Sequence, residues 1–227
     1  MGFSLRLAGY PMRVRTLYEI MTGAMLVHLV IHLFLFAAEV SAFVTTRGQL
    51  GPIQAFPVAA DMYVASYFIF GVAALIGSVT WFHWLDRSVK NLYADRIENF
   101  GRTPLQIVMA YMTPGPNLYR PLKDLKRLYG AFAAGEAFDE VRAPSVLTIW
   151  WLVSLVQLGL MGAELRFGFS VVTLLSGAFS IATAALGLVV LRKMALVQPY
   201  WRKGGRRGTR MVERPRHDDT HTETGTA

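Results

Sequence analysis

The chain has 227 residues, of which 53% are hydrophobic and only 17% are charged. This balance excludes an ordinary soluble domain and favours a protein that crosses a membrane several times. The formal net charge of +8 would suggest nucleic acid in a soluble chain, but no basic stretch has the interleaved aromatic residues that stack on bases, so no nucleic acid partner is expected.

Four stretches lack Asp, Glu, Lys and Arg for long enough to cross about 30 Å of hydrocarbon. They are residues 20–38, 62–85, 143–163 and 167–191. We therefore predict an all-α integral membrane fold within one domain, residues 1–201, whose two hairpins consist of transmembrane helices over about 17–42, 62–85, 143–163 and 167–194. The first stretch is interpreted as an uncleaved helix, because its apolar run is longer than the roughly 7–15 residues of a signal peptide.

Basic residues are distributed unequally over the connections between these stretches. The connection 86–142 and the region after residue 191 carry nine Lys or Arg each, whereas the two opposite connections carry one each, Arg47 and Arg166. By the positive-inside rule, both termini and the long connection face the cytoplasm, and the expected location is the bacterial cytoplasmic (inner) membrane. Residues 202–227 are basic, then polar and acidic, with almost no apolar side chain, which predicts a disordered cytoplasmic tail.

The first stretch carries three ionisable residues on one helical stripe, His28, His32 and Glu39. Ionisable groups inside a membrane are costly and often functional, and a histidine pair four residues apart can chelate a metal. No cysteine is present, and His83, the only other histidine of the four stretches, lies near the cytoplasmic end of its own stretch, at a different depth. We therefore favour histidines that are hydrogen-bonded within the bundle and predict no cofactor; a metal or haem at His28 and His32 is the alternative.

The segment 103–134 interrupts the apolar pattern. Residues 105–112 form an apolar run of about 12 Å as a helix, which is too short to cross a membrane. After the Pro-Gly-Pro sequence 114–116, apolar residues recur at helical spacing opposite basic ones, which predicts an amphipathic helix at the cytoplasmic interface. Two interpretations stay open, a surface connector or a re-entrant element that shapes a cavity between the hairpins. We expect the Asn117 side chain to bond backbone groups that Pro114 and Pro116 leave unpaired, as the re-entrant interpretation requires, whereas a solvated Asn117 would indicate a surface connector only.

Two further patterns are interpreted as structural. Small residues recur at helical spacing in the fourth stretch, at positions 176, 180, 183 and 187, and are expected to let helices approach closely. The tryptophans near the cytoplasmic ends of the stretches are typical of an interfacial aromatic belt, with Arg87 and Asn91 as anchors just beyond it.

Two motifs on either side of residue 103 carry a family resemblance, together with a tryptophan pair. The motifs are W-x-x-R-x-x-x-N and P-x-x-N-L-x-x-P, and with the pair they comprise Trp84, Arg87, Asn91, Pro114, Asn117, Pro121, Trp150 and Trp151. Over about residues 62–165 the chain resembles the bacterial membrane family known as domain of unknown function 4328. The resemblance implies a shared membrane architecture and marks these residues as candidates, without implying a reaction.

No nucleophile–base pair, phosphate-binding loop or H-E-x-x-H motif is present in the sequence, and no catalytic residue is predicted. The favoured function is a non-enzymatic accessory or regulatory membrane subunit that contacts lipid and a partner membrane protein. The alternative is an intramembrane enzyme, or a redox or cofactor-binding subunit, that uses the face of His28 and His32.

Overall fold

The computed structural model describes residues 14–167 and 169–198, and all regular structure in these residues is helical. The described α-helices are α1 (Arg15–Thr46), α2 (Pro52–Ala55), α3 (Ala60–Ala94), α4 (Pro104–Met112), α5 (Arg120–Ala134), α6 (Ser145–Phe167) and α7 (Val171–Val197). Short 3-10 helices stand between them: η1 (Pro57–Ala59), η2 (Glu98–Phe100), η3 (Pro116–Leu118) and η4 (Gly135–Glu140). The predicted all-α fold class is confirmed for this part of the chain, and the predicted tail, residues 202–227, lies outside it.

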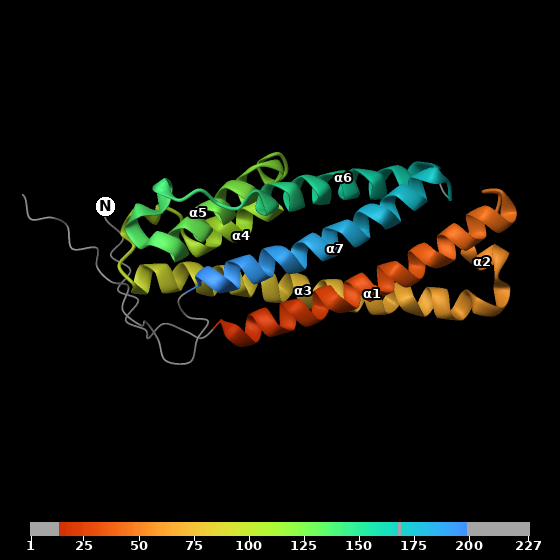
Figure 1. Ribbon diagram of the computed structural model, residues 1–227, viewed down its shortest axis with the longest axis horizontal. Helices are drawn as coiled ribbons and strands as arrows, with labels where there is room; N and C mark the ends of the chain where they lie inside the picture. The colour runs from red at the N-terminus through yellow and green to blue at the C-terminus, as the bar shows by residue number, and fades with distance from the viewer. Residues whose placement is uncertain (1–13, 168, 199–227) are drawn as a thin grey trace, which may run out of the picture.

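Four of these helices are long and apolar enough to cross a membrane, and they coincide with the four predicted stretches. As Figure 1 shows, α1, α3, α6 and α7 run along the long axis of the molecule, with α7 packed against both α1 and α6, and α1 packed against α3. α3 is longer than predicted, since its 35 residues extend over about 52 Å. It continues past residue 85 because Val89 and Leu92 remain buried on one face, while Lys90 pairs with Asp86 at 2.7 Å on the other.

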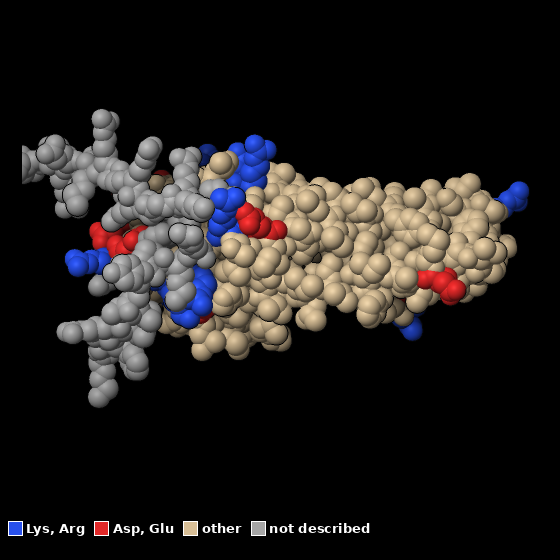
Figure 2. Space-filling view, turned by 90° about the horizontal axis from the view of Figure 1, so that it is seen from below, with Lys and Arg blue, Asp and Glu red and all other residues tan. Residues whose placement is uncertain are grey.

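Charge and apolar surface are segregated along this axis. On the face seen in Figure 2, charged residues gather at one end, and a long surface without any of them separates that end from the few charges at the other. Large apolar side chains of the long helices are exposed, among them Val30 at 63%, Phe68 at 74% and Leu75 at 66%. Exposed apolar surface on this scale marks helices that face lipid or another protein.

The buried core lies at the charged end and not at the middle of the long helices (Figures 1 and 2). It joins the start of α1, the second half of α3, α4, α5, the start of α6 and the end of α7. Its fully buried large side chains are Trp84, Leu85, Leu92, Phe100, Ile107, Leu125, Leu128, Leu147 and Met194. The segment between α3 and α6 therefore completes the core of the protein.

The apolar stripe of α5 shows how this happens. Leu125 and Leu128 are fully buried and Phe132 nearly so, which confirms the predicted amphipathic pattern. The stripe is covered by protein, because the rings of Phe132 and Trp84 pack edge to face with centroids 6.4 Å apart. A position of α4 and α5 at the membrane surface, or at membrane depth, stays a prediction.

Candidate functional site

The Pro-Gly-Pro turn between α4 and α5 is closed by backbone groups and one hydroxyl. The Thr113 hydroxyl and the Thr113 N–H both donate to the Met109 carbonyl, at 2.8 and 3.0 Å, which ends α4. The Asn117 N–H donates to the Thr113 carbonyl at 3.0 Å, and Gly115 takes a φ of 82°, which suits glycine. The Asn117 side chain makes no hydrogen bond to another described residue, so the role expected of it falls to Thr113. The physical reason is distance along the chain: Thr113 directly follows α4, so its hydroxyl lies next to the last carbonyls of that helix, whereas Asn117 lies beyond the turn.

Trp151 fixes this turn to the third long helix. Its indole N–H donates to the Leu118 carbonyl at 2.8 Å, and its ring packs on Tyr111 with centroids 6.0 Å apart. Pro121 is buried in the first turn of α5, where its missing N–H is harmless, and Pro114 is exposed. The second family motif and one tryptophan of the pair thus meet in space.

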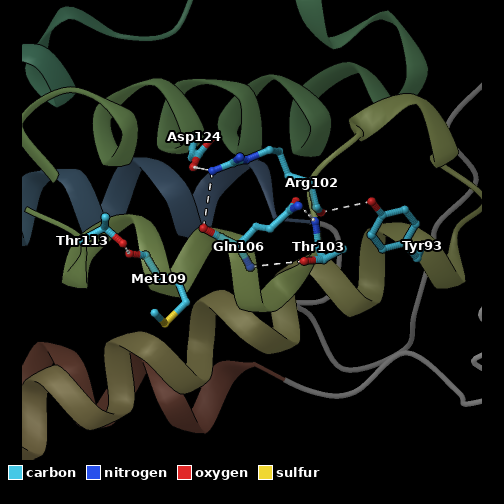
Figure 3. Close-up of polar contacts among 7 residues, drawn as sticks. All are labelled: Tyr93, Arg102, Thr103, Gln106, Met109, Thr113 and Asp124. Carbon is cyan, nitrogen blue, oxygen red and sulfur yellow. Dashed lines mark hydrogen bonds and ion pairs between the residues drawn. The ribbon is translucent and has the colours of Figure 1, made fainter. Parts of the chain in front are cut away.

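A polar cluster holds the start of α4 (Figure 3). Arg102 Nη2 lies 3.0 Å from Asp124 Oδ2 of α5 and 3.4 Å from the Gln106 carbonyl oxygen. Tyr93, near the end of α3, donates to the Arg102 carbonyl at 3.0 Å, and Thr103 forms a capping box with Gln106. Three helices are therefore tied at one corner. Sequence reasoning missed this cluster, although Asp124 is the one acidic residue in the otherwise basic α5.

The end of α7 is joined to α3 by a buried polar chain. The Trp84 indole N–H donates to Gln198 Oε1 at 3.2 Å, and Gln198 Nε2 donates to the Ser88 hydroxyl at 3.0 Å. Trp84, Ser88 and Gln198 are 1%, 0% and 4% exposed. Of the other motif residues on α3, Asn91 is buried and Arg87 is half-buried. The first family motif therefore contributes to the protein core.

The histidine pair is in contact but is separated from Glu39. The ring centroids of His28 and His32 are 4.5 Å apart, and Phe70 of α3 packs edge-on at 4.8 Å from each. Glu39 lies eleven residues beyond His28, about 16 Å along the helix. Within residues 14–167 and 169–198, no group of three or more His, Asp or Glu residues is placed to hold a metal.

Glu39 belongs to a second polar cluster, at the end far from α4 and α5. Its Oε1 accepts from the Tyr63 hydroxyl at 3.1 Å and, more weakly, from the Tyr67 hydroxyl at 3.4 Å. On the neighbouring helix pair, the Ser176 hydroxyl donates to Glu164 Oε2 at 3.1 Å. These contacts tie α1 to α3 and α6 to α7.

A cavity of about 300 Å³ lies among α1, α3, α4, α6 and α7. Aromatic side chains form much of its wall, and the ring of Trp81 lies 6.0 Å from that of Trp150 and 6.5 Å from that of Tyr111, between centroids. His28 and Thr183 also line it, and none of its described lining residues is Lys, Arg, Asp or Glu. The cavity is therefore uncharged and largely apolar.

Three polar atoms of this wall are buried without a hydrogen-bond partner in the described residues: Trp150 Nε1, the Tyr111 hydroxyl and the Thr183 hydroxyl. The Trp81 indole lies beside the Tyr111 hydroxyl, but it can only donate, so the phenol O–H has no acceptor among the described residues. Burial raises the pKa of Tyr111 well above its ordinary value, so the phenol keeps its proton and can donate. The wall can therefore donate hydrogen bonds to a neutral ligand that carries an acceptor, but its described residues include no charged side chain that could pair with an ionic ligand.

The described chain is thus an all-α protein with four helices able to cross a membrane, a core at one end and an aromatic cavity beside it. It belongs to the family described as Domain of unknown function (DUF4328), whose model matches residues 47–195. The family resemblance inferred from the sequence is confirmed by this match. No curated protein and no solved structure matches the chain at a significant level.

The family-motif residues are divided among the core, the turn and the cavity. Trp84 joins the polar chain with Gln198, Trp151 holds the turn, and Trp150 lines the cavity. Sequence reasoning missed Tyr111, Thr183 and Gln198. A signal existed only for Thr183, which lies on the small-residue stripe of the fourth stretch.

Proposed function

We propose that the chain is a multi-pass protein of the bacterial cytoplasmic membrane, threaded as two hairpins with both termini in the cytoplasm. The segregated charge in Figure 2 and the unequal number of basic residues in the connections support this threading. In this orientation α4 and α5 cap the cytoplasmic end of the bundle, and the basic face of α5 meets water and lipid headgroups.

Reporter fusions test the threading. Fusions after Ala60 and after Arg166 should report a periplasmic position, and a fusion after Leu128 a cytoplasmic one. A periplasmic report at residue 128 would contradict the orientation.

We further propose that the protein is a non-enzymatic accessory or regulatory subunit that contacts lipid and a partner membrane protein. The main observation that supports a partner is an exposed apolar stripe along α3. Its members recur at intervals of three or four residues, the spacing of a helix–helix seam, and are 43–74% exposed: Val64, Phe68, Val72, Leu75 and Val79. No described helix of the chain covers this stripe.

Site-specific photo-crosslinking in native membranes tests the partner. A photoreactive residue at Leu75 should give a protein adduct of one defined mass, whereas the same residue at the buried Leu128 should give only intramolecular products. Val79→Asp should abolish the adduct at Leu75, because it places a charge within the seam. Adducts with lipid alone, at both Leu75 and Phe68, would reject a partner on this face.

A redox or cofactor-binding subunit is the second candidate, and two observations favour it. His28 lines the cavity, and His32 Nε2 is buried without a hydrogen-bond partner among the described residues. An absorption spectrum and a metal analysis of the purified protein test this candidate. A chromophore or stoichiometric metal that is lost in the folded double variant His28→Gln/His32→Gln would establish it, and a colourless, metal-free, folded wild type would reject it.

A further inference from the structure

We propose that the cavity among α1, α3, α4, α6 and α7 binds a neutral, membrane-soluble carbonyl compound. Its oxygen accepts hydrogen bonds from the unpaired donors of the wall, and its apolar body lies against the aromatic side chains. The proposal goes beyond the accessory function, since neither the threading nor the contact with a partner requires a ligand here.

The unpaired donors are the first argument. Trp150, Tyr111 and Thr183 come from three different helices, α6, α4 and α7, and all three line the same cavity. The Trp150 indole N–H can only donate, and this residue is 9% exposed. Buried polar groups in native proteins nearly always have a partner, so three such groups on one wall suit a ligand that brings an acceptor.

The position of the Trp150 nitrogen is the second argument. A Cβ atom on Gly187 of α7 would lie 3.3 Å from Trp150 Nε1, so the glycine leaves room for the indole at that point. Thr183 lies one helical turn before Gly187, so its hydroxyl and the indole N–H belong to the same side of the cavity. One oxygen atom placed there is within reach of donors from both α6 and α7.

The composition of the wall identifies the ligand as neutral. A charged molecule would lose its hydration without gaining an ion pair, because no Lys, Arg, Asp or Glu lines the cavity in the described part of the chain. The volume of about 300 Å³ is at the lower end of small-molecule sites, whose pockets have volumes of roughly 300–1,000 Å³. A planar ring or a short length of acyl chain is both uncharged and small enough for this volume.

Water is a poor alternative occupant of this space. The cavity has the volume of about ten waters at roughly 30 Å³ each. Most of the wall is apolar, formed by residues such as Met25, Ala73, Phe82 and Leu191, so these waters would bond chiefly to one another. A carbonyl compound instead matches both the donors and the apolar wall.

Two sources supply such a carbonyl, a quinone ring and the ester of an acyl lipid, and two probes distinguish them. The full chain is purified in detergent and its tryptophan fluorescence is titrated with a short-chain alkyl 1,4-benzoquinone, or with a phosphatidylglycerol that carries brominated acyl chains. Both probes quench tryptophan at short range, and Trp81 and Trp150 line the cavity. We expect saturable quenching by one of them. Saturation by the quinone alone indicates a quinone ring, and saturation by the brominated lipid alone indicates an acyl ester.

Variants connect the quenching to the cavity. Thr183→Val and Tyr111→Phe remove one hydroxyl each at nearly constant volume and should weaken binding by roughly three- to tenfold. Ala74→Phe places a ring in the cavity and should abolish saturation. Tyr119→Phe is the matched control, because Tyr119 is 58% exposed and lies outside the cavity, and it should bind as the wild type does.

Thermal unfolding separates binding from a merely structural role. Without probe, Thr183→Val should unfold at the wild-type temperature or above it, because it removes an unpaired buried hydroxyl. The saturating probe should raise the unfolding temperature of the wild type more than that of this variant. If neither probe saturates, or if Thr183→Val and Tyr111→Phe both bind with wild-type affinity, the proposal is wrong. The two hydroxyl variants keep the test valid even where Ala74→Phe does not fold.

Discussion

Gln198 links α7 to α3 through two buried hydrogen bonds, and its replacement by leucine should destabilise the protein. Gln198→Leu keeps most of the volume and removes both partners, the acceptor for Trp84 and the donor to Ser88. The Trp84 indole can only donate and its residue is 1% exposed, so its N–H is left unpaired at a cost of about 1–3 kcal/mol. Ser88 adds little, because a helical serine can turn its hydroxyl to the carbonyl one turn earlier. At roughly 2–4 °C per kcal/mol for a chain of this size, a loss of about 2 kcal/mol lowers the unfolding temperature by about 4–8 °C.

A double-mutant cycle isolates this contact from changes in packing. The unfolding temperature and free energy are measured in detergent for the wild type, Gln198→Leu, Trp84→Phe and the double variant. Because Trp84→Phe already removes the donor, the second substitution should then cost at least about 1 kcal/mol less than it does alone. Gln49→Leu serves as the control, since Gln49 is exposed and its replacement should change stability by no more than about 0.5 kcal/mol. Additive effects, within about 0.3 kcal/mol, would show that the Trp84–Gln198 contact contributes no stability.

Three more sets of substitutions test the packing of α5, its ion pair with Arg102 and the polar cluster around Glu39. Gly130→Ala places a Cβ atom 2.5 Å from the Phe138 carbonyl oxygen of η4 and should lower the free energy of unfolding by about 1–3 kcal/mol, measured by thermal unfolding. Gly159→Ala is the control, because no atom lies within 4 Å of its added Cβ, and it should be neutral or stabilising. Equal effects of the two substitutions would contradict the close approach of α5 and η4. Asp124→Ala removes the only carboxylate partner of Arg102 among the described residues and leaves its guanidinium with the longer contact to the Gln106 carbonyl, so it should cost about 1–3 kcal/mol, with faster proteolysis between residues 103 and 130. Arg102→Ala in the same chain should recover part of this loss, and failure to do so counts against the pair. Glu39→Ala should be less stable than Glu39→Gln by about 1 kcal/mol, because only glutamine keeps an acceptor for the two tyrosine hydroxyls; the reverse order would refute the contact.

The spans and the amphipathic helix were predictable because each depends on a pattern within one segment. A run without charged residues marks a helix that can cross a membrane, and the spacing of Leu125, Leu128 and Phe132 marks the buried face of α5. The length of α3 was not predictable in this way. Its polar continuation after residue 85 lies beside α4 and α5, and only the packing of these helices shows that Val89 and Leu92 are buried.

The candidate site could be predicted from the sequence only in part, because tryptophan occurs both at membrane interfaces and in protein interiors. Tryptophan combines an apolar body with one donor, so it fits a membrane interface and a protein interior equally well. The sequence interpretation as an aromatic belt therefore did not foresee that Trp84 is covered by protein or that Trp150 lines a cavity. Tyr111 and Thr183 are 72 residues apart and line the same cavity only because α4 folds back onto the bundle. No local pattern in the sequence predicts this arrangement.

The cavity lies where two kinds of helix packing meet. At the charged end, α4 and α5 cover apolar side chains with protein, and the core is closed. Farther along the bundle the helices bury little apolar surface and are joined by polar pairs such as Gln157 with Ser180, at 3.1 Å, as expected where lipid removes the hydrophobic drive for helix association. Met21 and Trp150 of the core and His28 and Thr183 of the open bundle face the same cavity. A ligand bound there would contact both regions at once. Of the helices that line this cavity, α3 also carries the exposed stripe proposed to bind a partner, so a ligand in the cavity and a partner on the stripe would both contact the same helix.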